Sequence, residues 1–354
     1  MRRCALQDIR AGMKLARPIY SPDGTILLSA GMELRSSYIE RLNVLDISHV
    51  YIEDELTQDI DIPDVVDESV RREVVTAARS IIEHSRVGKG IDAERAKKTA
   101  NMLVDELSSN RGTLVNFTDM RARGEYLFSH VANVCILSIM TGMNLGYDQL
   151  RLRDLGVGAL LHDVGQIFIP KEIFDKNEKL TQEEVDAIRR HPELGFELIR
   201  KSPEISILSA HCAFQHHERV DGSGYPRGLQ GSDVHQYAQI VGIADVFDAL
   251  SSNSAYRRAL HPREALAILQ KASDKFFDEA ILQAFCDNIA VYPIGSLVRL
   301  NTKQIAVVVD ISREAKSRPV VRIVLDEWNQ KMANFLEIDL SKHPQVYVES
   351  IVNQ

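Results

Sequence analysis

The strongest constraint in this sequence is a stretch from residue 111 to about residue 290 in which apolar residues recur at helical spacing. Apolar residues three or four positions apart lie on one face of a helix, and short breaks at Gly, Pro or Asn separate the segments. Helices of this kind bury their apolar faces against one another, so we expect an all-α domain here. Thr181 and Glu184 form a capping-box pattern, which predicts the start of one helix.

The first 60 residues differ and are typical of a small α/β module, which we interpret as regulatory. Runs at 16–20, 25–28 and 49–52 are predicted to be strands. Between the second and third runs, Ser37 and Glu40 form another capping-box pattern, which predicts a helix. The sequence therefore predicts a mixed α/β segment ahead of the helical domain.

The remaining segments are a connector and a tail. Residues 53–68 are acidic and are expected to form a linker, and residues 69–110 have a helical pattern of mixed charge. After residue 292, β-rich runs at 297–300, 305–309 and 320–324 alternate with polar turns. We therefore expect an N-terminal module at 1–60, connector helices at 61–110, a helical domain at 111–292 and a β-rich C-terminal extension at 293–354.

Composition narrows the class of function. The 42 Lys and Arg residues against 50 Asp and Glu give a net charge of −8, which argues against binding to polymeric nucleic acid. No secretory signal is recognised, and no stretch is expected to span a membrane. The four cysteines are far apart and form no CxxC pair, so we expect no disulfide framework and a cytoplasmic location.

Histidines concentrate in the helical domain. Six of the eleven lie within residues 130–217, and two pairs are notable: His162 is followed by Asp163, and His216 by His217. Burying unpaired imidazoles beside a carboxylate is costly without a ligand, so these pairs favour a metal site. The two oxygens of Asp163 suit it to bridge two ions. His211 within this stretch, and the five histidines outside it, are interpreted as ordinary or structural: His49, His84, His235, His261 and His343.

The donor types indicate the metal but do not prove a site. Nitrogen and oxygen donors without thiolate favour Fe, Mn or Zn, and octahedral preference favours Fe or Mn. His-Asp and His-His pairs also occur by chance, and an isolated His130 or His191 would be read as a core histidine. The residues alone therefore leave a two-metal site and a plain histidine-rich core as alternatives.

Four motifs follow one another in the helical region: His162-Asp163-Val164-Gly165, Arg190-His191-Pro192-Glu193-Leu194-Gly195, His216-His217-Glu218 with Asp221-Gly222-Ser223-Gly224-Tyr225-Pro226, and Ala244-Asp245-Val246-Phe247-Asp248-Ala249-Leu250. In order and spacing they resemble the HD-GYP domain family, an HD-superfamily group of cyclic di-GMP phosphodiesterases, and the resemblance covers about residues 111–290. The first 55 residues resemble a domain of unknown function often found ahead of this domain.

The resemblance implies a mainly α fold, with an all-α HD-type domain, and a site with two divalent metals, Fe or Mn. One ion would bind His130, His162 and Asp245. The other would bind His191, His216 and His217, and Asp163 would bridge them. Catalytic roles are implied for Asp163, Gln166 and Tyr225, and substrate contacts for Gly222, Gly224, Tyr225 and Arg257.

The implied activity is hydrolysis of cyclic di-GMP to pGpG or GMP by a hydroxide that bridges the metals. Other expected partners are related dinucleotides, GGDEF-type signalling proteins and a second copy of the chain in a homodimer. Two other hypotheses remain: a weakly active or inactive cyclic di-GMP receptor, and a phosphodiesterase for another cyclic or linear dinucleotide.

The sequence departs from the family at three positions. Gln166 and Ser254 stand where the family usually has Lys and Arg, so two cations that would contact phosphate are missing. Tyr126 stands where some members have a Glu for a third metal, so we expect two metals. Losing a preorganised donor typically costs roughly 10²–10³ in kcat, which predicts reduced activity. Arg257 matches a basic family position, and Lys171, Lys176 and Lys179 are candidate replacements.

Overall fold

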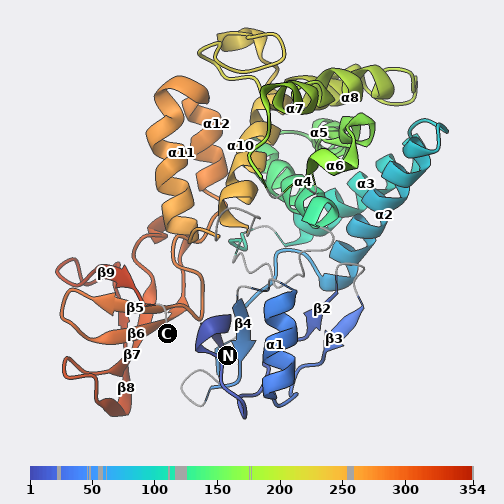
Figure 1. Cartoon of the computed structure of the whole chain (residues 1–354). Coiled ribbons are helices and arrows are strands. Elements are labelled where there is room, and N and C mark those ends of the chain that lie inside the picture. Colours follow the sequence, from blue (N-terminus) through green and yellow to red (C-terminus); the bar gives the residue numbers. More distant parts are fainter. Residues whose placement is uncertain are drawn as a thin grey trace. The chain divides into compact units, whose positions relative to one another are not determined.

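The structure is a computed structural model that describes residues 1–21, 25–45, 47, 49–54, 59–60, 62–110, 112–115, 126–174, 176, 178–252 and 259–352. The chain forms two compact units, each assembled from separate parts of the sequence (Figure 1). The terminal unit comprises Met1–Val65, Gly112–Tyr126 and Ile289–Gln354. The helical unit comprises Val66–Arg111 and Leu127–Asn288.

The helical unit consists of packed α-helices, as the sequence predicts (Figure 1). Two short 3-10 helices, η4 (Val164–Phe168) and η5 (Gly231–Asp233), lie between them. The α-helices are α2 (Glu68–Arg86), α3 (Ala93–Ser109), α4 (Tyr126–Asn144), α5 (Gln149–Leu161), α6 (Lys171–Phe174), α7 (Gln182–Ile188), α8 (His191–Ile199), α9 (Ile207–Gln215), α10 (Gln236–Ser251), α11 (Pro262–Phe276) and α12 (Glu279–Cys286).

Helix α4 is the apolar centre of this unit. By length and composition alone, its segment Leu127–Asn144 could cross a membrane, which the sequence analysis did not anticipate. In the structure 78% of this segment is buried, and Val131, Ala132 and Leu137 are almost wholly inaccessible. Packing within the unit therefore accounts for the apolar character of the helix.

Helices α2 and α3 belong to the helical unit rather than to a separate connector. They pack against each other, and α3 packs against α5. The apolar residues Ala96, Leu103 and Val104 of α3 are fully buried. The mixed surface charge that suggested a connector lies on the outer faces, whereas the inner faces are part of the core. The structure thus differs here from the expected boundary at residue 110.

The two capping-box predictions have different outcomes. Helix α7 begins as predicted, because Glu184 donates its backbone N–H to Thr181 and accepts one from the Thr181 backbone at 2.7 Å. The prediction at Ser37 was wrong. Helix α1 (Ser36–Val44) begins two residues earlier, with Arg35 at the N-cap and no side-chain cap.

The terminal unit is rich in strands, and the three predicted strands of the N-terminal module and the three of the C-terminal tail are present. Two two-stranded antiparallel pairs, β1 with β4 and β2 with β3, accompany α1, and the tail forms one antiparallel sheet of order β8-β7-β6-β5-β9. The strands are β1 (Arg2–Ala5), β2 (Ile19–Tyr20), β3 (Ile26–Leu28), β4 (His49–Ile52), β5 (Leu297–Leu300), β6 (Ile305–Asp310), β7 (Val320–Leu325), β8 (Lys331–Asp339) and β9 (Val348–Ile351).

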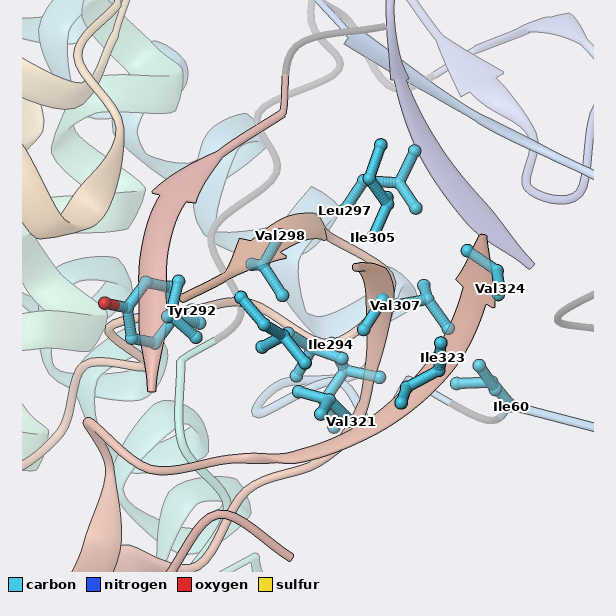
Figure 2. Packing of buried hydrophobic residues seen from close by; sticks show 14 of the residues in the cluster. Ile60, Tyr292, Ile294, Leu297, Val298, Ile305, Val307, Val321, Ile323 and Val324 are labelled. Carbon is cyan, nitrogen blue, oxygen red and sulfur yellow. The ribbon is translucent and has the colours of Figure 1, made fainter. Parts of the chain in front are cut away.

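The expected linker contributes to the core of this unit. Ile60 and Ile62 are buried in the same apolar cluster as Tyr292 and the strands of the tail, and Figure 2 shows Ile60 alongside Ile323 and Val324. The acidic composition of the segment concealed two residues that pack inward. The interpretation as a solvated linker is therefore wrong for Ile60 and Ile62.

An ion pair reinforces this packing. Both guanidinium Nη atoms of Arg322 donate to the carboxylate of Asp59 at 2.6 Å, and Arg322 also binds Glu337. The hydrogen bonds from Arg322 lower the pKa of Asp59 to about 2. The contact ties the segment before α2 to strand β7 of the C-terminal sheet.

Candidate metal centre

Asp163 lies at the centre of a cluster of histidines in the helical unit, and its two carboxylate oxygens face different groups. Oδ1 is 3.3 Å from His191 Nε2 and 3.7 Å from His216 Nε2. Oδ2 is 3.3 Å from His162 Nε2 and 3.9 Å from His130 Nε2. A carboxylate placed in this way is suited to bridge two cations, one on each side.

The donor atoms form two groups, each with its atoms within 4.8 Å of one another. One group contains His191, His216 and His217, and the other contains His130, His162 and Asp245. This is the same division that the resemblance to the HD-GYP family implies. In the second group His130 Nε2 is 3.2 Å from Asp245 Oδ1.

The ends of several helices bring these side chains together. His162 follows the last residue of α5, Asp163 precedes η4, and His216 and His217 follow α9. Helix α5 packs against α9, and η4 packs against α8, which begins at His191. Gly165 is required at the second contact, because a Cβ there would overlap the carbonyl oxygen of His191.

Hydrogen bonds on the far ring nitrogens fix the histidine orientations. Nδ1 of His162 donates to Ala159 O at 2.8 Å, and Nδ1 of His191 donates to Ile188 O at 2.7 Å. Nδ1 of His216 donates to backbone carbonyls at the end of α9. Each bond places the proton on Nδ1 and leaves the Nε2 lone pair facing Asp163. This is the arrangement that proteins use to orient metal-binding histidines.

His130 has a carboxylate partner instead of a carbonyl. Its Nδ1 donates to Asp248 Oδ2 at 2.7 Å, and Asn133 Nδ2 donates to Asp248 Oδ1 at 2.8 Å. Asp248 is fully buried on α10, one helical turn from Asp245. Asp248 belongs to the motif at residues 244–250, but its contact with His130 was not predicted from the sequence.

Burial and charge indicate that this donor set fits divalent cations. Burial raises the pKa of Asp163, but the surrounding histidines outweigh it and hold the pKa well below its usual range. Burial lowers the pKa of His130, but hydrogen bonds to Asp245 and Asp248 raise it well above its usual range. His162 Nε2 is buried without a hydrogen-bond partner among the described residues. Cations between these groups would pair the orphaned nitrogen and displace the proton on His130.

The loop after His217 covers one side of the cluster. The Tyr225 ring stacks on the His217 ring with centroids 4.6 Å apart. Glu218, which is buried, accepts the backbone N–H groups of Arg227 at 2.8 Å and Leu229 at 3.0 Å. Gly224 packs so closely under this loop that a Cβ would overlap the Arg219 backbone nitrogen. The glutamate therefore anchors the loop that carries Tyr225.

Arg189 is a cation at this loop that the sequence analysis missed. It is exposed at the end of α7, and its Cζ lies 5.2 Å from the centroid of the Tyr225 ring. No ion pair involves Arg189 within the described part of the chain. By contrast, Lys176, one of the predicted replacements for the missing cations, is paired with Glu184 at 2.8 Å.

Two other predicted site residues are less informative. Gln166 is half-buried in η4, where its backbone bonds to Asp163 and Ile169, and no side-chain hydrogen bond of Gln166 occurs among the described residues. Gly222 adopts a positive φ of 82° at the base of the Tyr225 loop. Arg257 and Ser254 lie outside the described residues.

A helical unit with two groups of donor residues, on either side of the Asp163 carboxylate, is typical of HD-domain proteins. The family model of the HD domain matches residues 103–281, and the chain belongs to this family. A KOW domain associated with the HD domain matches residues 297–354. The identification from the sequence motifs is confirmed.

Individual relatives agree with this assignment. The chain is 30% identical over 268 residues to the cyclic di-GMP phosphodiesterase PA4108 of Pseudomonas aeruginosa, covering 73% of this chain and 64% of that protein. It is 34% identical over 167 residues to 3'3'-cGAMP-specific phosphodiesterase 1 of Vibrio cholerae, covering 47% and 38%. The chain thus spans less than two thirds of each of these relatives.

A solved structure supports the fold. Bd1817 of Bdellovibrio bacteriovorus, described as an HDG"Y"P protein, superposes with a TM-score of 0.53 at 19% identity. The match covers 80% of this chain and 98% of that chain. The expected mainly α architecture, with its small N-terminal module and strand-rich C-terminal sheet, is confirmed.

Proposed function

We propose that this protein is a metal-dependent phosphodiesterase that hydrolyses cyclic di-GMP to pGpG or GMP in bacterial second-messenger signalling. The observation that carries the proposal is the position of Asp163, whose two oxygens face two separate groups of donor atoms. Fe or Mn fits a site of nitrogen and oxygen donors without thiolate. We retain the cytoplasmic location, GGDEF-type partners and a homodimer as parts of this proposal.

Each group in the site has a role in this reaction. Two divalent cations, when bound, supply a water that is deprotonated near neutral pH and neutralise charge on the phosphate. The histidines and Asp245 would hold the cations, and Asp163 would lie between the two groups. Burial of the ring raises the pKa of Tyr225, so its hydroxyl stays protonated and can donate a hydrogen bond to the substrate.

Arg189 is proposed to bind the phosphate that the metals do not hold. A cyclic dinucleotide carries two phosphodiesters, and a metal pair binds only one of them. The guanidinium of Arg189 lies against Tyr225, and Tyr225 stacks on the predicted ligand His217. A planar guanidinium recognises phosphate oxygens through paired N–H groups. Arg189 could thus replace a cation missing at Gln166 or Ser254.

A related substrate is the second candidate, and the similarity to a 3'3'-cGAMP-specific phosphodiesterase favours it. A loop that stacks a base on Tyr225 accepts either purine, because every base has an aromatic face. A receptor that binds cyclic di-GMP without cleaving it is the alternative from another class. The site carries both complete donor groups, which favours catalysis.

The test is to incubate anaerobically purified, metal-analysed protein with cyclic di-GMP and, separately, with 3'3'-cGAMP, and to resolve the products over time. We expect pGpG or GMP from cyclic di-GMP, and no product with Asp163→Ala at equal protein concentration. Faster cleavage of 3'3'-cGAMP would move the assignment to the second candidate. Full metal content and tight nucleotide binding without product would support the receptor.

A further inference from the structure

A chain of hydrogen bonds connects helix α2 to His130, a predicted metal ligand. Arg71 Nη1 on α2 donates to Asn133 Oδ1 on α4 at 2.5 Å. Asn133 Nδ2 donates to Asp248 Oδ1 at 2.8 Å, and His130 Nδ1 donates to Asp248 Oδ2 at 2.7 Å. Three helices thereby contribute to the orientation of one imidazole.

The polarity of the chain is fixed by chemistry. A guanidinium only donates and a carboxylate only accepts, so the Asn133 amide must point its oxygen at Arg71 and its nitrogen at Asp248. Asp248 accepts its other hydrogen bond from His130 Nδ1. His130 Nε2 therefore faces the predicted metal position, 3.2 Å from Asp245 Oδ1.

Burial makes each link matter. Asn133 is 1% exposed, Asp248 is fully buried and His130 is 5% exposed, so water cannot readily replace a missing partner. Without the Arg71 guanidinium, the buried Asn133 oxygen would lose its donor, and the amide that binds Asp248 would lose a contact that holds it in place.

A second contact places α2 near the same centre. Helix α2 packs against η4, the turn that directly follows Asp163. Arg79, two turns further along α2, also stacks its guanidinium over Phe128 of α4 at 5.1 Å. The helix therefore supports both the bridging carboxylate's turn and the helix that carries His130.

We propose that Arg71 is a positioning residue for the metal centre, acting through Asn133 and Asp248 to hold His130. The inference rests on the two-metal site of the proposed function and goes beyond it, because it assigns α2 to the centre. It also distinguishes the two metal positions. Arg71 supports the group that contains His130, because its hydrogen bond to Asn133 leads through Asp248 to that histidine.

The test measures metal binding rather than activity. The full chain would be prepared free of metal and titrated with Mn²⁺ as wild type, Arg71→Gln, Arg71→Lys and Arg72→Gln, by calorimetry and electron paramagnetic resonance. Arg72 is the exposed neighbour of Arg71 and serves as the matched control. Loss of a residue that orients a ligand typically weakens metal binding by roughly 10- to 100-fold.

We expect Arg71→Gln to weaken one of the two Mn²⁺ sites by that factor and to leave the other unchanged. Arg71→Lys should lose less, because it keeps the charge, and Arg72→Gln should match the wild type. Equal weakening of both sites, or no weakening, would overturn the role of Arg71. If Arg71→Gln does not fold, Arg71→Met, which keeps the aliphatic stem but has no donor, takes its place, and the same outcomes support or overturn the role. A wild type that does not bind two ions would instead refute the proposed function.

Discussion

Glu218→Gln tests whether the buried glutamate anchors the Tyr225 loop. The carboxylate accepts two backbone N–H groups, from Arg227 and Leu229, and a hydrogen bond to a charged group contributes about 1.5–3 kcal/mol. Glutamine keeps one acceptor but turns an NH₂ group toward the other N–H, so one bond is lost. We expect the free energy of unfolding to fall by about 2 kcal/mol, and the Tm of the helical unit by roughly 4–8 °C.

The functional consequence follows from the position of the loop. If the docked loop is destabilised by more than about 1.4 kcal/mol, substrate binding weakens, and KM for the cyclic dinucleotide should rise roughly tenfold. The change in kcat should be smaller, and the metal content should stay at the wild-type value, because Glu218 bonds the loop and no predicted ligand. Thermal unfolding, steady-state kinetics and metal analysis measure the three quantities.

Glu204→Gln is the matched control, since Glu204 is exposed between α8 and α9. It should leave the Tm and the KM unchanged. If Glu218→Gln had the same Tm and KM as the wild type, the anchoring argument would be refuted. Loss of metal at an unchanged KM would show that Glu218 supports the metal centre instead of the loop.

Three further predictions concern charged positions. Gln166→Lys should raise kcat/KM for cyclic di-GMP at unchanged metal content, most clearly at low salt because screening weakens the added charge; steady-state kinetics with no increase would show that this cation does not limit the reaction. Arg189→Gln should raise KM for cyclic di-GMP and 3'3'-cGAMP alike, and the control Arg190→Gln should not. A rise in KM for cyclic di-GMP alone would assign Arg189 to base recognition. The pKa of Asp59 is about 2 in the folded protein and 3.8 ordinarily, so the ion pair with Arg322 stabilises the folded protein above pH 4 and loses this effect as the pH falls toward 2. The difference in free energy of unfolding between wild type and Asp59→Asn, measured by urea unfolding, should therefore narrow from pH 4 to pH 2. A constant difference would contradict the assignment.

The sequence predicted the part of the site whose signals are local. His162-Asp163 and His216-His217 are adjacent pairs, and each lies where an apolar helix ends, so their chemistry could be read without a structure. The repeating apolar pattern likewise predicted packed helices. Both signals depend on residues that are neighbours in the chain.

The supporting contacts could not be predicted because they join distant residues. Asn133 and Asp248 are 115 positions apart, and Arg71 and Asn133 are 62 apart. Nothing in the sequence near Arg71 separates it from the exposed Arg72 beside it. Only the packing of the structure shows that the Arg71 side chain points toward Asn133 on α4.

The acidic composition of residues 53–68 led to the wrong prediction of a solvated linker at Ile60 and Ile62. Residues 53–68 are acidic on average, and an average does not show which side chains point inward. Ile60 and Ile62 are buried against the C-terminal sheet more than 200 residues away in sequence. A weak signal was present, since apolar residues alternate with acidic ones at 59–62, as in a half-buried extended segment.

The most direct test of the two-metal account is the number of Mn²⁺ ions per chain and the magnetic coupling between them. We predict two ions per wild-type chain with an exchange-coupled paramagnetic resonance spectrum, since one carboxylate bridges them. Asp163→Ala should lose both ions together, whereas His191→Ala should weaken one. A single zinc bound by cysteines, two uncoupled ions, or full retention of both ions in Asp163→Ala would contradict the account.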